Sequence, residues 1–338
     1  MSSDVSPAPA GSSTAARNLR GLLASLASAV VLTGALSASA QEITTFREGT
    51  LPRQWSVAGP TCAEQPDFQV HQYNPDFYIL RQSGCTHHEK PFIYLIFGDD
   101  EVLMLDTGAG IEEDLTTTPM DIVTVVDHVI EDWLMANGRD DIPLLVSHLH
   151  SHGDHTAGDE QLAARPNTTV IAPSVEAISE YFGITTWPEE IVEYDLGDRI
   201  VDIIAIPGHD QNSFAYYDHE TGLLLTGDSF YPGRIYVNGD PLVFIASHQR
   251  LVDFALSHTV TSILGTHIEQ SRTPFVDYPV GTVYQPDETP LEMTVGQLLE
   301  LNEYFKTMGE TFVPHRFAGY SICGGYPTCD AQTVTVTE

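Results

Sequence analysis

The sequence predicts an α/β fold, arranged as a four-layer αββα sandwich. Two observations lead to this prediction. Short apolar runs of strand length alternate along the chain with amphipathic stretches of helical length. The alternation occurs in two successive halves, as expected when two sheets pack face to face and helices cover their outer sides.

The first half contains β-rich runs at residues 77–80, 91–97 and 101–105. A helix is expected next, with Thr118 as its N-cap, Pro119 as its first residue and Gly138 at its end. Its apolar residues share one face, which predicts packing against a sheet. They are Ile122, Val125, Val126, Val129, Ile130, Trp133 and Leu134. The apolar run at 142–149 then predicts a buried strand.

The second half repeats this alternation. A helix is expected near residues 174–182. Strands are expected at 169–172, 200–206, 214–217 and 223–226. The segment Thr289-Pro-Leu-Glu292 matches a capping box and predicts an amphipathic helix that continues to Met308.

Residues 147–158 are rich in metal-binding side chains. Four histidines and an aspartate lie within eight positions, and imidazole and carboxylate are natural ligands of zinc. The pattern His-x-His-x-Asp-His fits in one register, because a start at His148 would require an aspartate where His152 stands. The residues in that register are His150, His152, Asp154 and His155. They follow the predicted strand directly, where open α/β sheets bind their ligands, which indicates a metal-dependent enzyme.

This pattern resembles the signature of the metallo-β-lactamase fold superfamily. Four further segments resemble the other motifs of that family and occur in the same order. They are Val102-Leu-Met-Leu-Asp106-Thr-Gly108, Ile206-Pro-Gly-His209, Leu224-Leu-Thr-Gly-Asp228 and Gly265-Thr-His267. The resemblance implies the four-layer αββα sandwich of the metallo-β-lactamase type.

The resemblance also implies two zinc ions per chain. The first would be bound by His150, His152 and His209, the second by Asp154, His155 and His267, and Asp228 would bridge them. Two ions about 3.5–4 Å apart can share a hydroxide and lower its pKa towards roughly 7. The expected mechanism is attack of this hydroxide on a carbonyl that one zinc polarises.

Two residues are candidates for catalytic roles. Asp154 can orient the hydroxide or shuttle its proton. Tyr231, three residues after Asp228, resembles a tyrosine of the N-acyl homoserine lactonases and is a candidate donor to the oxyanion or leaving group. The alternative for Tyr231 is an ordinary aromatic residue in a loop.

The expected function is that of an exported dizinc hydrolase acting on an ester, a lactone or a related carbonyl substrate. The β-lactamases of the superfamily usually lack an aspartate at the bridging position, so Asp228 favours the lactonase, esterase and glyoxalase II branches. Glyoxalase II itself binds glutathione through basic residues, and residues 285–310 offer only Lys306. A β-lactam hydrolase, a mononuclear-iron persulfide dioxygenase and a binding protein without activity stay open as alternatives.

The N-terminus has the pattern of a signal peptide over residues 1–40. Arg17 and Arg20 precede an apolar stretch, and Ala38-Ser-Ala40 matches a cleavage site before Gln41. We therefore expect a periplasmic or secreted protein with no membrane segment after cleavage, and the alternative is an uncleaved membrane anchor. The expected divisions are an extension at 41–90, the catalytic domain at 91–310 and a tail at 311–338.

The four cysteines allow three pairings. Pairs Cys62–Cys85 and Cys323–Cys329 are preferred, because each brackets one segment with glycine or proline. They would place one disulfide in the extension and one in the tail. A bond between the N-terminal segment and the tail is the alternative.

The chain is strongly acidic, with a net charge of −33. Removing residues 1–40 leaves 12 basic and 46 acidic side chains, a net charge of −34, and the only lysines are Lys90 and Lys306. This balance disfavours nucleic acid and anionic membranes as partners and favours a small neutral carbonyl substrate. The oligomeric state is left open.

The remaining histidines carry weaker patterns. His148 ends the predicted strand, and His248 precedes an expected helix, so either residue could reach the metal site. The pair His87-His88 beside Cys85 indicates at most adventitious metal binding at a loop. The other five are expected to be structural: His71, His128, His219, His258 and His315.

Overall fold

The computed structural model describes residues 46–55, 62, 65–308, 311–325 and 329 of the 338-residue chain. The described residues form one compact unit. The predicted signal peptide lies outside the described residues and stays a prediction. Among the described helices, none combines the length and the apolar character needed to span a membrane.

The first sheet has six strands that follow one another in sequence order. They are β1 Phe68–Asn74, β2 Phe77–Gln82, β3 Phe92–Phe97, β4 Val102–Leu105, β5 Leu144–Ser147 and β6 Thr168–Val170. Strands β1 to β4 are antiparallel neighbours, whereas β4, β5 and β6 run parallel. Every residue of β2, β3, β4 and β5 is buried, as expected for strands covered on both faces.

The second sheet has the order β13-β12-β10-β9-β8-β7, and a small third sheet has the order β11-β15-β14. The strands of the second sheet are β7 Ile191–Asp195, β8 Ile200–Ala205, β9 Phe214–Asp218, β10 Leu223–Gly227, β12 Ser262–Gly265 and β13 Glu292–Met293. Those of the third are β11 Arg234–Tyr236, β14 His315–Arg316 and β15 Ser321–Cys323. Strands β8, β10 and β12 share one direction.

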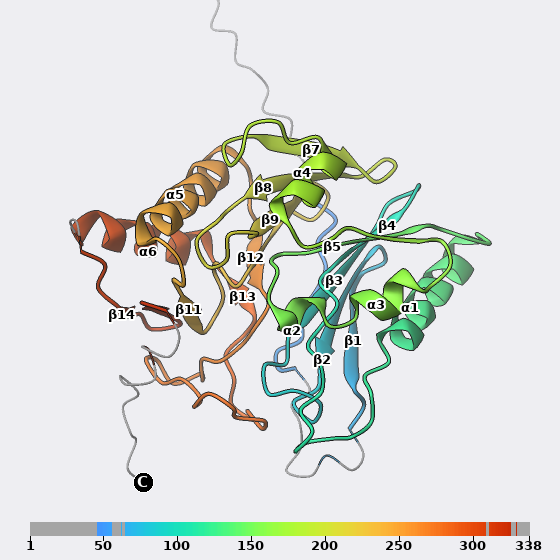
Figure 1. The fold of residues 1–338 in the computed structure, drawn as a ribbon, viewed down its shortest axis with the longest axis horizontal. Coiled ribbons are helices and arrows are strands. Elements are labelled where there is room, and N and C mark those ends of the chain that lie inside the picture. Colours follow the sequence, from blue (N-terminus) through green and yellow to red (C-terminus); the bar gives the residue numbers. More distant parts are fainter. Residues whose placement is uncertain (1–45, 56–61, 63–64, 309–310, 326–328, 330–338) are drawn as a thin grey trace, which may run out of the picture. The chain divides into compact units, whose positions relative to one another are not determined.

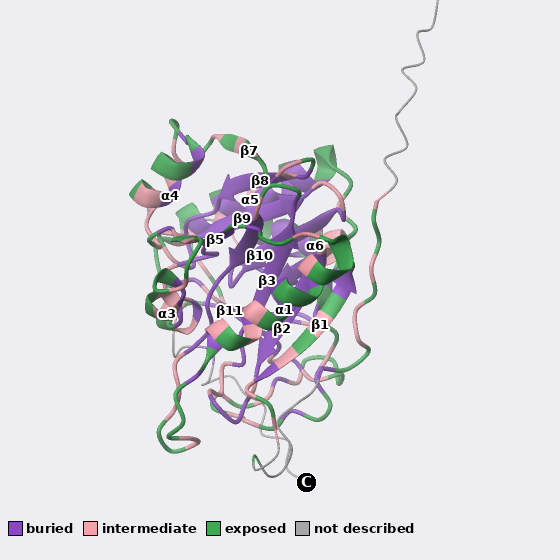
Figure 2. Cartoon of the chain, turned by 90° about the vertical axis from the view of Figure 1, so that its right-hand side faces the viewer, coloured by how far each residue is buried: buried purple, intermediate pink, exposed green. Residues whose placement is uncertain are grey.

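Helices cover the outer faces of the two sheets (Figure 1). The helices are α1 Ile122–Asn137, α2 Gly153–Thr156, α3 Asp159–Ala163, α4 Val175–Phe182, α5 Pro241–Ser257 and α6 Val295–Thr307. Apolar residues of α1 pack on the first sheet, and those of α5 and α6 pack on the second. A third apolar cluster fills the space between the sheets. Buried residues accordingly follow the strands, and exposed ones lie on the outer sides of the helices (Figure 2). The predicted αββα sandwich is confirmed.

Two predicted helix starts were wrong. Helix α1 begins at Ile122 rather than at Pro119, because Asp121 caps it by accepting a hydrogen bond from the Thr124 amide. Helix α6 begins at Val295, where Thr294 and Gln297 form the capping box. The matching pattern at Thr289 does not open a helix, because Glu292 and Met293 pair with β12 as strand β13.

Residues of the predicted extension and tail form strands of two different sheets. Strands β1 and β2 of the expected extension belong to the first sheet, together with β3 to β6 of the expected catalytic domain. Strands β14 and β15 of the expected tail pair with each other, and β15 pairs with β11. The preferred pairs Cys62–Cys85 and Cys323–Cys329 are both bonded, which confirms that pairing.

Candidate metal centre

The predicted ligands lie at one edge of the two sheets because they follow strands that point the same way. After β5, a loop carries His150 and His152, and the short helix α2 carries Asp154 and His155. In the second sheet, His209 follows β8, Asp228 follows β10 and His267 follows β12. The residues that follow the carboxyl ends of these strands therefore lie close together, although the strands are far apart in the sequence. Ligand sites of α/β sheets are expected at this edge.

Asp106 holds the histidine-rich loop in place. It stands directly after β4 with a left-handed backbone (φ 68°), which aspartate tolerates better than most residues. One carboxylate oxygen accepts the Leu149 amide at 2.8 Å, and the other accepts from Nδ1 of His155 at 2.7 Å. The loop and the His155 ring are therefore oriented by one buried carboxylate.

The first ligand group consists of three imidazoles. Nδ1 of His152 lies 3.0 Å from Nε2 of His150 and 3.2 Å from Nε2 of His209. One ligand atom from each residue lies within 4.8 Å of the other two. His150 and His209 are buried, and His152 is half-buried.

The second group adds carboxylates to imidazoles. Oδ2 of Asp154 lies 3.2 Å from Nε2 of His155 and 3.4 Å from Nε2 of His267. Asp228 completes this group, and all four ligand atoms again lie within 4.8 Å of one another.

Asp228 faces both groups. Its Oδ2 lies 3.8 Å from Nε2 of His150 and 3.6 Å from Nε2 of His209. Its Oδ1 lies 3.7 Å from Nε2 of His155 and 3.3 Å from Nε2 of His267. The structure thus places one oxygen of this carboxylate toward each group, which is the arrangement a bridging ligand needs.

The outer nitrogens of three histidines are held by hydrogen-bond acceptors. Nδ1 of His209 donates to the carbonyl of Tyr236 at 2.8 Å, and Nδ1 of His267 donates to the carbonyl of Glu89 at 2.9 Å. Asp106 does the same for His155. A proton on Nδ1 leaves Nε2 with a lone pair that points toward the carboxylates.

The inner nitrogens of the second group have no hydrogen bond. Nε2 of His155 and Nε2 of His267 are buried without a hydrogen-bond partner among the described residues. Buried polar atoms are almost always satisfied, so these two point to a missing partner. Inward lone pairs beside carboxylates fit divalent cations, and the residues present therefore fit the pair of metal ions that the motif implies.

The charges of the centre favour cations. Burial alone would raise the pKa of Asp228, but His267 and the other imidazoles hold it well below its usual range. Burial alone would lower the pKa of His155, but Asp154 and the neighbouring carboxylates raise it well above its usual value. The carboxylates likewise raise the pKa of His267, so without a metal they attract protons to these two histidines, and a metal ion would displace those protons.

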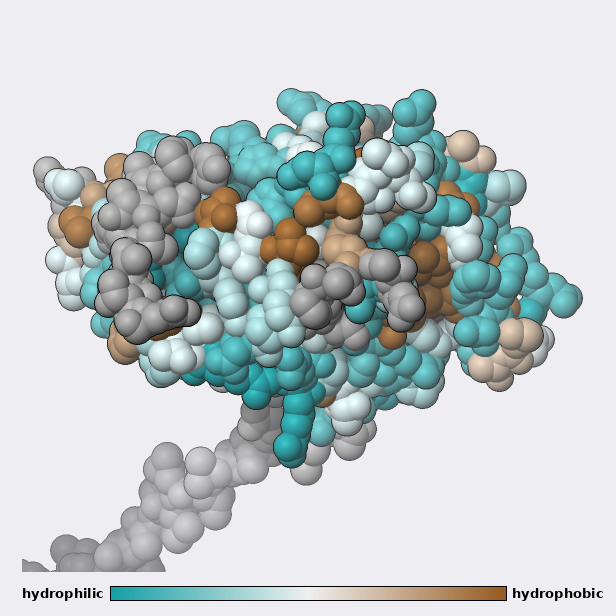
Figure 3. All heavy atoms as spheres, turned by 90° about the horizontal axis from the view of Figure 1, so that it is seen from below, coloured by the Kyte–Doolittle hydropathy of each residue, from teal (hydrophilic) through white to brown (hydrophobic). Residues whose placement is uncertain are grey.

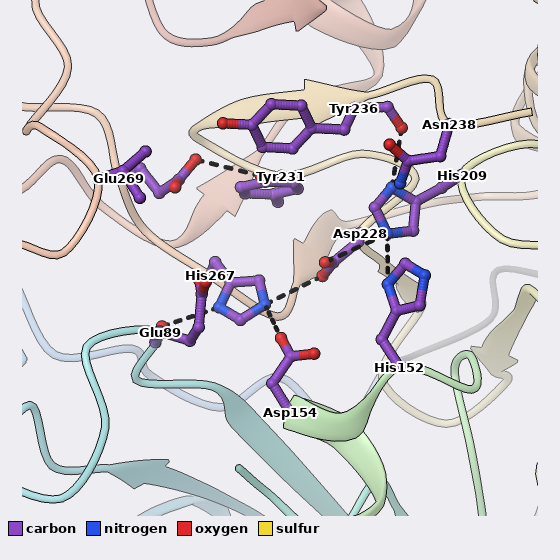
Figure 4. Close-up of a pocket in the computed structure, with 11 residues that line it drawn as sticks. Glu89, His152, Asp154, His209, Asp228, Tyr231, Tyr236, Asn238, His267 and Glu269 are labelled. Carbon is purple, nitrogen blue, oxygen red and sulfur yellow. Dashed lines mark hydrogen bonds and ion pairs between the residues drawn. The ribbon is translucent and has the colours of Figure 1, made fainter. Parts of the chain in front are cut away.

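A cavity of about 180 Å³ opens above the ligands (Figure 4). Its lining comprises Glu89, His152, Asp154, His209, Asp228, Tyr231, Tyr236, Asn238, His267, Glu269 and Val280. Asp154, a predicted catalytic residue, thus reaches the cavity. Gly265 allows the close approach of Tyr231, because a Cβ atom on this glycine would lie 2.2 Å from the Tyr231 Cβ.

The hydroxyl of Tyr231 makes hydrogen bonds within the protein. It donates to the carbonyl of Arg234 and lies 3.1 Å from a carboxylate oxygen of Glu269. The ring packs edge-on against His267 with 5.7 Å between ring centroids. Tyr231 therefore contributes a wall of the cavity, and its hydroxyl would have to leave Arg234 to reach a substrate.

Two other histidines lie outside both groups. Nε2 of His148 contacts Oδ1 of Asp159 at 2.9 Å. His248 lies within α5 instead of preceding it, and its Nε2 donates to the carbonyl of Leu298 at 2.9 Å. The carbonyls that orient His209 and His267 were not predicted, because a backbone acceptor carries no signal in the sequence.

The family model of the metallo-β-lactamase superfamily matches residues 89–261. The chain belongs to this superfamily. The match covers half of the chain and begins at Glu89, next to the loop that orients His267. It confirms the predicted resemblance to the superfamily, and the segment Gly265-Thr-His267 lies after the matched residues.

Curated relatives match over part of their length. A hydroxyacylglutathione hydrolase of Brucella anthropi is 33% identical over 106 residues, which cover 30% of this chain and 40% of the relative. Another, from Ectopseudomonas mendocina, is 33% identical over 139 residues, which cover 40% of this chain and 51% of the relative. The chain thus spans about half the length of these relatives, or less.

Solved structures show likeness at low identity. ETHE1 from Myxococcus xanthus is 17% identical with a TM-score of 0.42, covering 70% of this chain and 82% of that one. An archaeal superfamily protein from Sulfolobus tokodaii is 14% identical with a TM-score of 0.40, covering 68% of this chain and 86% of that one.

Proposed function

We propose that the chain is a hydrolase that binds two zinc ions and cleaves an ester, a lactone or a related carbonyl compound. The observation that carries the proposal is the position of Asp228, with one carboxylate oxygen toward each ligand group. When bound, two such ions supply Lewis acidity and lower the pKa of water to roughly 7.

Different residues of the chain would bind the metal ions, accept a proton and orient a ligand. His150, His152 and His209 would hold one ion, and Asp154, His155 and His267 the other, with Asp228 shared between them. Asp154 lines the cavity, so its carboxylate can accept a proton from attacking water. Asp106 keeps His155 in the tautomer that turns Nε2 inward.

The cavity walls support a neutral substrate. Glu89 and Glu269 line the cavity, and none of the lining residues is a lysine or arginine. The nearby Arg234 is bound to Glu269 at 2.6 Å. The described surface is also largely hydrophilic on the face shown in Figure 3. An acidic wall in an acidic chain disfavours polyanionic substrates and nucleic acid.

A second candidate is thioester hydrolysis, which the hydroxyacylglutathione hydrolase relatives favour. The chemistry at the carbonyl would be the same. Glutathione, however, carries carboxylates, and they would meet the carboxylates of Glu89 and Glu269.

The test combines metal analysis with a substrate panel: a nitrophenyl ester, an acyl homoserine lactone, a cephalosporin and a glutathione thioester. We expect two zinc ions per chain and turnover of the neutral ester or lactone, abolished by a chelator and restored by zinc. Asp154→Asn should lose most of the activity, whereas Asp253→Asn, on the exposed side of α5, should keep it. Chelator-resistant turnover would overturn the proposal, and one iron per chain without hydrolysis would indicate a dioxygenase instead.

We also propose that the protein is exported, on the pattern of its N-terminus alone. Expression in a bacterium with a periplasm should yield a mature protein that begins at Gln41. Edman sequencing of the periplasmic fraction would check this, and a cytoplasmic product that keeps residues 1–40 would contradict it.

A further inference from the structure

A third group of metal-binding side chains lies outside the dinuclear centre. It comprises His87 and His88, in the turn before β3, and Glu112, in the loop after β4. One ligand atom from each lies within 4.8 Å of the other two, and all three side chains are half-buried. The sequence showed only the adjacent histidines, because Glu112 joins them through the fold.

The two loops that carry this group are joined by several contacts. The amide of Glu112 donates to the carbonyl of Thr86 at 2.9 Å, and the amide of His88 donates to the Glu112 carboxylate at 3.3 Å. Nδ1 of His88 contacts the same carboxylate. The Cys62–Cys85 disulfide anchors the chain two residues before His87. These contacts keep the two loops together without a bound ion.

The ligand atoms of the three side chains lie close together. The rings of His87 and His88 stack with 5.0 Å between centroids and 19° between planes, so the adjacent residues face the same side. One of the two rings has to turn to bind the same ion as the other, because a metal lies in the plane of each imidazole that binds it. Nε2 of His88 also lies 3.1 Å from a carboxylate oxygen of Glu89. Two carboxylates around one imidazole attract positive charge, which either a proton on His88 or a divalent cation can supply.

We propose that His87, His88 and Glu112 bind a third divalent metal ion of the zinc type. Two imidazoles and a carboxylate form a ligand set that zinc accepts, with solvent in the fourth position. Ligand atoms around zinc lie roughly 3.3 Å apart, so the three side chains need to close by about 1.5 Å at most. Half-burial leaves the site open to solvent ions.

The third site and the dinuclear centre share one loop. Glu89 follows His88 directly, and its carbonyl accepts from Nδ1 of His267 at 2.9 Å. Its side chain lines the central cavity. A metal at the third site would therefore order the loop that orients a ligand of the centre.

The test is a zinc count on the purified full chain. Samples are dialysed against zinc buffers over a range of free zinc and analysed by mass spectrometry. We expect the wild type to bind one equivalent more at saturation than Glu112→Gln or His87→Ala. The matched control is His219→Ala. His219 is also a half-exposed histidine beside a carboxylate, 2.9 Å from Asp202, but it is not part of a three-residue ligand group. Equal counts for the wild type and both site variants would overturn the proposal.

A check on folding and a second measurement support the interpretation of the zinc count. Glu112→Gln retains an oxygen that can accept the His88 amide, so it preserves the loop, and thermal unfolding in chelator checks that each variant folds. Hydrogen exchange of the 83–90 loop in saturating zinc gives a second readout, expected to be at least about threefold faster in His87→Ala than in the wild type. The loss of one equivalent does not depend on hydrolysis, so a failure of the proposed function leaves this test unchanged.

Discussion

The two ligand groups of the centre differ in charge and in how firmly their side chains are held. The first group consists of three imidazoles, and among the described residues only His209 has its outer nitrogen bound to a carbonyl. Nδ1 of His150 is buried without a hydrogen bond among the described residues. The second group has two carboxylates, and Asp106 and the Glu89 carbonyl fix both of its histidines.

This difference predicts an order of metal binding. Carboxylates attract a cation more strongly than neutral imidazoles do, and outer hydrogen bonds reduce the cost of ordering the ligands. The second group should therefore fill first as zinc is added, and the first group should depend on the shared carboxylate of Asp228.

The largest effect is expected from Asp228→Asn, because this change removes a charged ligand from both groups. We expect kcat/KM on the best substrate to fall by about 1000-fold or more, and the zinc affinity of both sites to fall. Steady-state kinetics and zinc titration measure these effects. Normal affinity at either site would show that Asp228 does not bridge.

The pair His155→Ala and His152→Ala tests the order of binding directly. At low free zinc, where one ion is bound, His155→Ala should lose that ion, whereas His152→Ala should bind it as the wild type does. At high free zinc both variants should bind fewer ions than the wild type. If His152→Ala instead lost the tighter ion, the first group would be the one that fills first, which contradicts the predicted order.

A smaller effect is expected from Asp106→Asn, which keeps the size and the tolerated left-handed backbone but weakens the hold on His155. The affinity of the second group should fall by about 10- to 100-fold, as is usual for loss of an outer partner. The first group should keep its affinity. An equal loss at both sites would mean that Asp106 supports the loop as a whole rather than one ligand.

The smallest effect is expected from Thr266→Val, which removes the hydroxyl that donates to Oδ1 of Asp228. One hydrogen bond of about 1 kcal/mol corresponds to roughly a fivefold loss of metal affinity. Competition with a chromophoric chelator measures this change. A loss above about 100-fold would mean that the Asp228 rotamer depends on Thr266 far more than one hydrogen bond explains.

The sequence predicted the elements whose signals are local. The apolar runs of β2 to β5 and the stripe of α1 depend on periodicity, and Gly138 ends α1 as expected. The capping box at Thr289 misled, because pairing of Glu292 and Met293 with β12 outweighs a weak local preference for helix. Strands β1, β14 and β15 were not predicted, because their places in the sheets come from pairing.

For the centre, the sequence by itself determined which residue types could bind metal, since their spacing follows the ends of successive strands. Only the tertiary structure decided that Asp228 faces both groups, that the hydroxyl of Tyr231 is bound by Arg234 and that Glu112 joins His87 and His88. The physical reason is that the direction of a side chain and its hydrogen-bond partners are set by contacts between segments distant in the chain. The residues of a single segment do not reveal those contacts.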